Sequence, residues 1–298
     1  MTTAEESSAL ESAASDDSAG PPRPSRQNID VFGMTHQGLV RKENQDQFLI
    51  GSVHKALQVH QSSLPEGELG SLLSPSRGWL FLVADGVGGV PGGQQASGTA
   101  LKAIAAYVTS AMALYTEFSD ETEPAFLEDL RKSVEKSHEA VLAAGQEDGL
   151  HAGMATTLTM VAVRWPRAYL VHVGDSRCYR LRDGALELLT RDQTLAQALV
   201  DAGALPPEAT EQSGLKHVLW SAVGGSEAKI EVRASDQRWE DVMVLCSDGL
   251  TKHVSDDEIK AQLESGDSAE AMCRQLIELA LGRGGTDNVT VIIGRLRR

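Results

Sequence analysis

Residues 82–97 have the sequence LVADGVGGVPGGQQAS, and this turn is the most informative stretch of the chain. The apolar run at 79–84 ends on a single carboxylate, Asp85, and glycines follow at positions 86, 88, 89, 92 and 93. Because glycine adopts positive φ angles and allows close approach to its backbone, an acid here could hold a small charged ligand. The same pattern is typical of a strand-to-helix turn with a capping aspartate, so the segment alone supports both interpretations.

The composition is that of a globular protein with an acidic surface. The chain has 298 residues, 41% of them hydrophobic, and a formal net charge of −15. This length allows one large domain or two small ones. The negative charge disfavours nonspecific binding to nucleic acid or to an anionic membrane, and no apolar run approaches the ~18 residues of a membrane helix. We therefore expect no nucleic-acid partner and no membrane association.

The cysteines and the N-terminal segment indicate a cytoplasmic protein with one folded domain. The three cysteines, at 178, 246 and 273, form no CxxC pair, and an odd number argues against a disulfide framework. The N-terminus lacks the basic start and apolar block of a signal peptide. Because residues 1–28 are rich in Ser, Ala, Asp, Glu and Pro, we expect a disordered tail there and a single domain at 29–298.

Alternating and continuous apolar patterns predict many short strands that follow one another closely, as in an antiparallel meander. The predicted strands lie at about 29–38, 47–51, 78–85, 156–163, 168–175, 177–184, 187–190, 241–248 and 288–296. Helical spacing or capping predicts helices at about 94–115, 124–144, 195–202, 255 onward and 267–282. Many antiparallel strands with two pairs of helices indicate an α+β protein in which sheets are sandwiched between helical layers.

Five aspartates share one kind of position, at strand boundaries and mostly next to glycine. They are Asp46, Asp85, Asp175, Asp248 and Asp287. Each alone is more often a turn former, but strand ends on one side of a sheet can bring such residues together. Clustered carboxylates repel one another and raise one another's pKa unless a cation neutralises them. Oxygen ligands without His or Cys fit Mg²⁺ or Mn²⁺ better than zinc.

Two such ions about 4 Å apart would activate water near neutral pH and clamp a phosphoryl group. Arg41, five residues before Asp46, carries a planar guanidinium suited to phosphate oxygens. Other phosphate chemistries lack their motifs. No cysteine has an arginine six residues later, as a cysteine-dependent phosphatase requires, and GxxxxGK[ST] is absent.

Six motifs occur in order within about residues 29–296: RKENQD, DGVGG, MATT, VGDSR, CSDGL and GTDN. Together they resemble the motifs of the metal-dependent protein phosphatases, the protein phosphatase 2C or PPM family, and most of all its bacterial serine/threonine form. The resemblance implies a four-layer α-β-β-α sandwich, with two central antiparallel sheets flanked by helix pairs. It also implies hydrolysis of phosphoserine and phosphothreonine in proteins without a covalent intermediate, a signalling role opposite a cognate Ser/Thr kinase, and a monomer.

The resemblance also implies a role for the residues of the DGVGG, CSDGL and GTDN motifs. Asp85 would bridge two Mn²⁺ or Mg²⁺ ions, and the carbonyl of Gly86 would bind the second ion. Asp248 and Asp287 would bind the first ion.

The remaining motifs supply the surroundings that the family resemblance implies. Asp46 would support the metal-bound waters, and Asp175 would form a third, weaker metal site together with Asp248. Arg41 would bind the substrate phosphate, and residues 194–228 would form a flap beside the active site.

Three positions depart from the family pattern. Gln45 stands where glutamate is common, so the second ion would bind more weakly or rely on Asp46 and waters. Val87 stands where many eukaryotic members have a proton-donating histidine. Pro91 is unusual and would alter access to the site. Two alternatives to a protein phosphatase stay open. One is a regulator that binds phosphoproteins or a kinase without turnover, which only Gln45 favours. The other is an enzyme acting on small phosphoesters.

Overall fold

The computed structural model describes residues 24–54, 78–87, 92–112, 119, 121–148, 153–210 and 213–298. A short 3₁₀ turn at Arg26–Asn28 leads into the first strand. Most of the expected N-terminal tail, residues 1–23, and residues 88–91 with Pro91 lie outside the described ranges. The tail and the effect of Pro91 therefore stay predictions.

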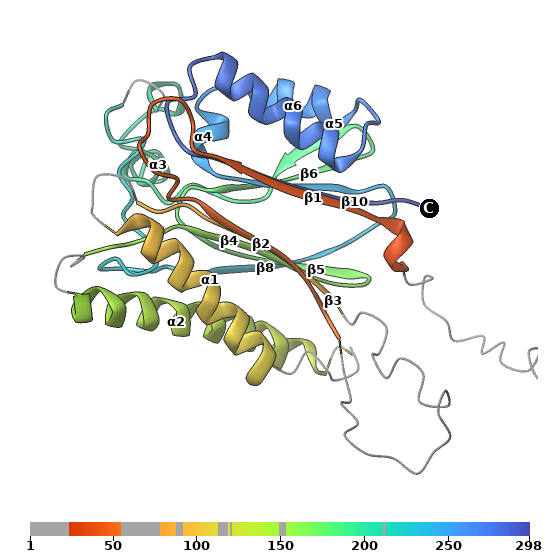
Figure 1. The fold of residues 1–298 in the computed structure, drawn as a ribbon, viewed down its shortest axis with the longest axis horizontal. Helices are drawn as coiled ribbons and strands as arrows, with labels where there is room; N and C mark the ends of the chain where they lie inside the picture. Colours follow the sequence, from red (N-terminus) through yellow and green to blue (C-terminus); the bar gives the residue numbers. More distant parts are fainter. Residues whose placement is uncertain are drawn as a thin grey trace, which may run out of the picture.

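In the part of the chain that the structure describes, ten strands form two five-stranded antiparallel sheets (Figure 1). The first sheet has the order β1 (Ile29–His36), β10 (Val289–Leu296), β9 (Val242–Cys246), β6 (Arg177–Arg182) and β7 (Ala185–Leu188). The second has the order β2 (Gln47–Val53), β3 (Gly78–Ala84), β4 (Leu158–Arg164), β5 (Arg167–Val173) and β8 (Glu231–Asp236). The two sheets pack face to face.

Helices cover the outer face of each sheet (Figure 1). The long helices α1 (Gly93–Ser110) and α2 (Glu123–Asp148) pack on the second sheet, and α4 (Asp248–Thr251), α5 (Asp256–Leu263) and α6 (Ala269–Gly282) pack on the first. A third apolar cluster, which includes Phe81, Leu245 and Ile292, fills the space between the sheets. Because each sheet is covered on both faces, its central strands are apolar almost throughout. The predicted four-layer sandwich is confirmed.

Strand register brings several chain reversals to one end of the sandwich, where α3 (Leu195–Asp201) lies at the left of Figure 1. His36, the last residue of β1, pairs with Val289, the first of β10. The end of β9 likewise pairs with the start of β6, and the start of β2 with the end of β3. The loops that carry the predicted acids therefore leave both sheets at the same end.

Each helix and strand expected from the sequence corresponds to an element of the structure, but strand β8 and helix α4 were not predicted. Strand β8 is a partly exposed edge strand with the polar sequence EVRASD, in which the apolar residues are only Val232 and Ala234. Helix α4 has only four residues and begins at Asp248, directly after the buried strand β9.

Candidate active site

The carboxylates predicted as one cluster do converge in the structure. Asp85 follows β3 at the site end of the second sheet. Removal from water raises the pKa of Asp85 well above its ordinary value, and the charges of four further acids raise it more. These four acids are Asp46, Asp248, Asp175 and Asp287. The other four predicted aspartates thus lie close enough to act on Asp85 electrostatically.

The backbone around Asp85 is fixed by the MATT motif, residues 154–157, which leads into the neighbouring strand β4. The backbone carbonyl of Asp85 accepts a hydrogen bond from the Thr156 hydroxyl at 2.8 Å. The backbone N–H of Asp85 donates to the Thr157 hydroxyl at 3.0 Å. A Cβ atom at Gly86 would lie 2.5 Å from the backbone of Gly93, the first residue of α1. The glycine is therefore required where the turn meets the helix, and it leaves the Asp85 side chain beside bare backbone.

Asp46 is the most buried of the acids, with 1% of its surface exposed. Its Oδ2 accepts hydrogen bonds from the hydroxyls of Ser247 at 2.7 Å and Thr290 at 2.6 Å. Burial raises the pKa of Asp46 to about 6, although the two hydroxyls act to lower it. Its Oδ1 is buried and has no hydrogen-bond partner among the residues that the structure describes.

Asp248 and Asp287 are joined by a lysine that the sequence analysis did not single out. Lys252 Nζ lies 2.6 Å from Asp248 Oδ2 and 2.6 Å from Asp287 Oδ2. Because Lys252 follows Asp248 by four residues, the α4 turn places both side chains on one side of the helix. Burial alone would lower the pKa of Lys252, but the two carboxylates raise it above its ordinary value, so the amine is charged.

Arg41 forms a two-pronged ion pair with Asp287. Its Nε lies 2.7 Å from Asp287 Oδ1, and a terminal guanidinium nitrogen donates to Oδ2 at 2.7 Å. Burial opposes ionisation of Asp287, but Arg41 and Lys252 lower its pKa below the ordinary value. Arg41 is still 41% exposed, so its guanidinium faces the solvent as well as the acid cluster.

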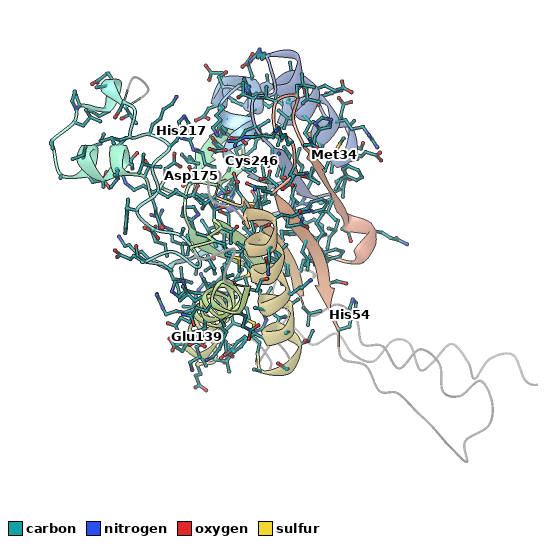
Figure 2. All side chains as sticks on the ribbon, turned by 60° about the vertical axis from the view of Figure 1, so that its left-hand side comes forward. Met34, His54, Glu139, Asp175, His217 and Cys246 are labelled. Carbon is teal, nitrogen blue, oxygen red and sulfur yellow. The ribbon has the colours of Figure 1, made fainter. Side chains whose placement is uncertain are left out.

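Asp175 lies in the turn after β5, and both Asp175 and His217 lie toward the end of the molecule that carries residues 194–228 (Figure 2). Burial raises the pKa of Asp175 well above its ordinary value, and the charge of Asp248 raises it further. His217 Nδ1 lies 3.9 Å from Asp248 Oδ2. The segment predicted as a flap therefore reaches the acid cluster through His217.

A second residue that the sequence analysis missed is Asn288, which ties the Arg41 loop to the loop that carries Asp287. Its side-chain amide donates to the carbonyls of Gln37 at 2.7 Å and Glu43 at 2.8 Å. Its Oδ1 accepts the backbone N–H of Gln45 at 2.9 Å. The motif GTDN gave a signal for Asn288, but its role depends on backbone groups about 245 residues away in the chain.

The structure shows the contacts of Gln45, which departs from the family pattern, and of the pair 192–193. The Gln45 side chain packs on Gly93, where a Cβ atom would lie 2.8 Å from the Gln45 amide carbon. Asp192 is bound by the guanidinium of Arg177, with one contact at 2.7 Å. Gln193 accepts the N–H of Gly174 at 3.0 Å. Asp192 and Gln193 thus hold Arg177, at the start of β6, and Gly174, after β5, in place.

The donor set fits divalent cations, although cations of the protein itself now lie among the acids. Within the described ranges, no three carboxyl, imidazole or thiol side chains are spaced as ligands of one ion. Lys252 and Arg41 hold the carboxylates of Asp248 and Asp287. Even so, in the described part of the chain Asp248 Oδ1 is buried without a hydrogen-bond partner, as is Asp46 Oδ1. Unpartnered, mutually repelling oxygen donors are the surroundings that hard divalent cations prefer.

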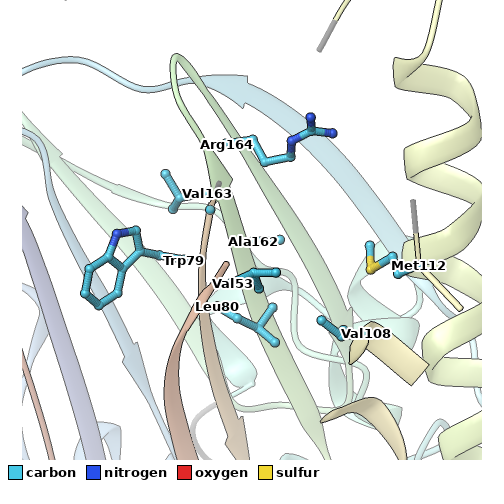
Figure 3. A pocket seen from close by; sticks show the side chains of 9 residues that line it. Val53, Trp79, Leu80, Val108, Met112, Ala162, Val163 and Arg164 are labelled. Carbon is cyan, nitrogen blue, oxygen red and sulfur yellow. The ribbon is translucent and has the colours of Figure 1, made fainter. Parts of the chain in front are cut away.

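A small apolar pocket at the other end of the second sheet is unrelated to this cluster (Figure 3). It lies between the start of β3, the end of β4 and the last turn of α1, and its walls include Leu80, Val108 and Met112. Among the described residues that line this pocket, the charged one is Arg164. The acid cluster, and not this apolar pocket, is therefore the candidate site.

Sequence comparison identifies the family to which this arrangement belongs. The protein phosphatase 2C family model matches residues 71–280. The chain belongs to the protein phosphatase 2C family. The resemblance inferred from the six motifs is therefore confirmed. None of the helices that the structure describes has both the length and the apolar character of a membrane span.

Related proteins of this family come from bacteria. The serine/threonine protein phosphatase PstP of Mycobacterium tuberculosis is 38% identical over 216 residues, which are 72% of this chain and 40% of that protein. The chain thus spans less than half the length of PstP. The serine/threonine phosphatase stp of Listeria monocytogenes is 33% identical over 217 residues, which are 72% of this chain and 83% of that protein.

Solved structures of the family share the fold. The catalytic domain of PstP in complex with two manganese ions superposes with a TM-score of 0.70 and 31% identity, covering 91% of this chain and 99% of that one. The serine/threonine phosphatase of S. agalactiae superposes with a TM-score of 0.73 and 27% identity, covering 90% of this chain and 100% of that one.

Proposed function

We propose that this chain is a metal-dependent serine/threonine protein phosphatase. The observation that carries the proposal is the convergence of five aspartates and Arg41 at one end of a protein phosphatase 2C fold. Relatives named serine/threonine phosphatases support it. The manganese bound by the PstP catalytic domain favours two Mn²⁺ ions, or Mg²⁺ in their place.

Different residues of the cluster would hold the different ions. Asp85 would bridge the two ions and the Gly86 carbonyl would bind one of them, while Asp248 and Asp287 would hold the other. Asp46 would accept hydrogen bonds from water at the site, and Asp175 with Asp248 would form a third, weaker site. When bound, such ions lower the pKa of a water molecule and neutralise the charge on a phosphoryl group.

Arg41 would orient the substrate phosphate. Its planar fork of donors matches two phosphate oxygens as well as it now matches the two oxygens of Asp287. None of the cysteines suits a covalent mechanism, since all three are buried and burial raises the pKa of the nearest, Cys246, to about 12. Direct attack by water on phosphorus is therefore the proposed route.

Exposed apolar side chains beside Arg41 favour a protein substrate over a small phosphoester. Leu39 and Val40 precede the arginine and are 65% and 66% exposed. Leu215 and Val218, in the proposed flap at residues 194–228, are also exposed. Such side chains can contact the residues that flank a phosphoserine or phosphothreonine. A kinase that acts in opposition, a monomeric state and a cytoplasmic location stay predictions.

Hydrolysis assays with and without metal test the proposal. The purified protein is assayed on p-nitrophenyl phosphate and on a phosphothreonine peptide, first in EDTA and then with Mn²⁺. We expect turnover only with metal. We also expect Asp248→Asn to reduce turnover by at least about a hundredfold, since it removes a metal-binding charge and little volume.

Asp236→Asn is the matched control, because Asp236 lies on the edge strand β8 and pairs with Arg167. It should leave turnover unchanged. Residual activity of Asp248→Asn above a tenth of the wild-type value would contradict the site assignment. If the wild type hydrolyses neither substrate at millimolar Mn²⁺, a phosphoprotein-binding regulator would be favoured instead.

A further inference from the structure

One ammonium group lies between two carboxylates that the proposed function assigns to the same metal ion. Lys252 Nζ is 2.6 Å from one oxygen of Asp248 and 2.6 Å from one oxygen of Asp287. These are the distances of short, charge-assisted hydrogen bonds. The lysine side chain is 20% exposed, so the contact is largely shielded from solvent.

An ion and this ammonium group cannot use the same oxygens in the same place. A divalent cation binds carboxylate oxygens at about 2.0–2.6 Å, which leaves no room for a bridging ammonium between them. Two positive groups so close together would also repel each other strongly. Binding of the ion between Asp248 and Asp287 therefore requires that Lys252 leave.

We propose that Lys252 is an internal competitor of the metal, which neutralises Asp248 and Asp287 in the metal-free protein and sets a threshold for metal binding. The inference rests on the proposed function, since it concerns the same metal site. The competitor is encoded locally, because Lys252 caps the C-terminus of the helix that Asp248 begins. Wherever α4 forms, the two side chains lie together.

The geometry also gives the exchange a route. Among the described residues Asp248 Oδ1 has no hydrogen-bond partner while Lys252 occupies Oδ2, so Oδ1 can bind an ion without losing a contact. Arg41 contacts both oxygens of Asp287, each at 2.7 Å, so it also has to release an oxygen of Asp287 when the ion binds. The lysine stem is long and unbranched and its helix ends at Thr251, so the ammonium can swing away without disturbing the fold.

Calorimetric titration with Mn²⁺ tests the competition directly. Wild type, Lys252→Met and Lys252→Gln are titrated after removal of metal with EDTA, and their melting temperatures are measured without and with Mn²⁺. We expect both neutral variants to bind Mn²⁺ at least about tenfold more tightly, since the competing charge is gone. Without metal they should melt lower than wild type, and their gain in melting temperature on adding Mn²⁺ should be larger.

Two controls separate competition from a general effect of lost charge. Lys252→Arg keeps a positive charge at the position and should not bind Mn²⁺ more tightly than wild type. Lys260→Met removes a lysine that pairs with Glu264 at the same four-residue spacing, on the outer helix α5. It should leave Mn²⁺ affinity unchanged.

The outcomes show whether the competition by Lys252 is wrong or the proposed metal site itself is wrong. If wild type binds Mn²⁺ and both neutral variants bind it equally or more weakly, the competition is wrong and the metal site stands. If neither the wild type nor any variant binds Mn²⁺, the metal site itself is wrong and the inference fails with it. Tighter binding by Lys252→Arg would also overturn it, because charge would not be the cause.

Discussion

At the scale of single residues, the site depends on glycines and on one asparagine as much as on its acids. A Cβ atom at Gly249 would lie 1.9 Å from the carbonyl oxygen of Asn288. One at Gly38, which has a φ of 82°, would lie 2.2 Å from the carbonyl oxygen of Asp287. The loops that carry Arg41, Asp248 and Asp287 can therefore meet only where side chains are absent.

Arg41→Ala tests the proposed phosphate contact at this scale. Loss of the guanidinium should raise KM for a phosphothreonine peptide about tenfold or more, since a charged, two-pronged contact is lost. The affinity for Mn²⁺ should not fall, because Arg41 supplies no metal-binding oxygen and its charge on Asp287 opposes that of the ion. Peptide kinetics and metal titration measure the two effects separately.

Arg274→Ala is the matched control for this substitution. Arg274 pairs with Glu270 on the exposed face of α6, at 2.7 Å, and lies in no part of the proposed site. Its removal should leave KM unchanged. An unchanged KM for Arg41→Ala as well would rule out the phosphate-binding role.

At the scale of elements, the helix starts were encoded more clearly than the chain reversals of the site. The capping box predicted at Ser255 and Glu258 is present: the Glu258 carboxylate accepts the Ser255 N–H at 3.0 Å, and the Ser255 side chain caps the first turn of α5. This cap is a local pattern of four residues, so sequence alone could reveal it.

Ser255→Ala should destabilise the protein by about 1 kcal/mol, because the first turn of α5 loses its cap. Urea unfolding in EDTA measures the loss. Ser226→Ala, in an exposed loop between α3 and β8, should leave the free energy of unfolding unchanged. Equal stability of Ser255→Ala and wild type would show that the cap contributes nothing here.

Sequence patterns could predict the strands and acids but not the groups that meet in space. Buried strands such as β3 and β9 are continuous apolar runs, and the five aspartates at strand ends were visible as a repeated context. Lys252 gave no such signal, since its role follows from a four-residue helix that the pattern did not predict. Asn288 acts through carbonyls on a distant loop, which no local pattern encodes.

At the scale of the whole molecule, polar groups buried in the second sheet link stability to pH. His172 on β5 is 1% exposed and contacts the Thr159 hydroxyl at 3.0 Å and the Arg191 carbonyl at 3.2 Å. Burial lowers its pKa below 6.5, against the opposing charges of Asp192 and Glu231. The unfolded chain therefore takes up this proton at a higher pH than the folded protein does.

The sign of this shift gives a prediction for His172→Gln. The contribution of the histidine to stability is present above pH 6.5 and is lost as the pH falls below it. The variant should be less stable than wild type at pH 7.5, and the difference should narrow at pH 5.5. Urea unfolding in EDTA at both values measures it, and a constant or widening difference would contradict the assignment.

The pairing of β1 with β10 has a consequence for the folding of the protein during translation. These strands pair from Ile29 with Leu296 to His36 with Val289. During translation, β1 can therefore pair only after β10 has been synthesised. Most of the second sheet and both long helices emerge earlier and can assemble first, since domains fold as translation proceeds. Arg41 and Asp287 meet only once β10 has left the exit tunnel. In a nascent chain the proposed site is therefore incomplete until β10 has been synthesised.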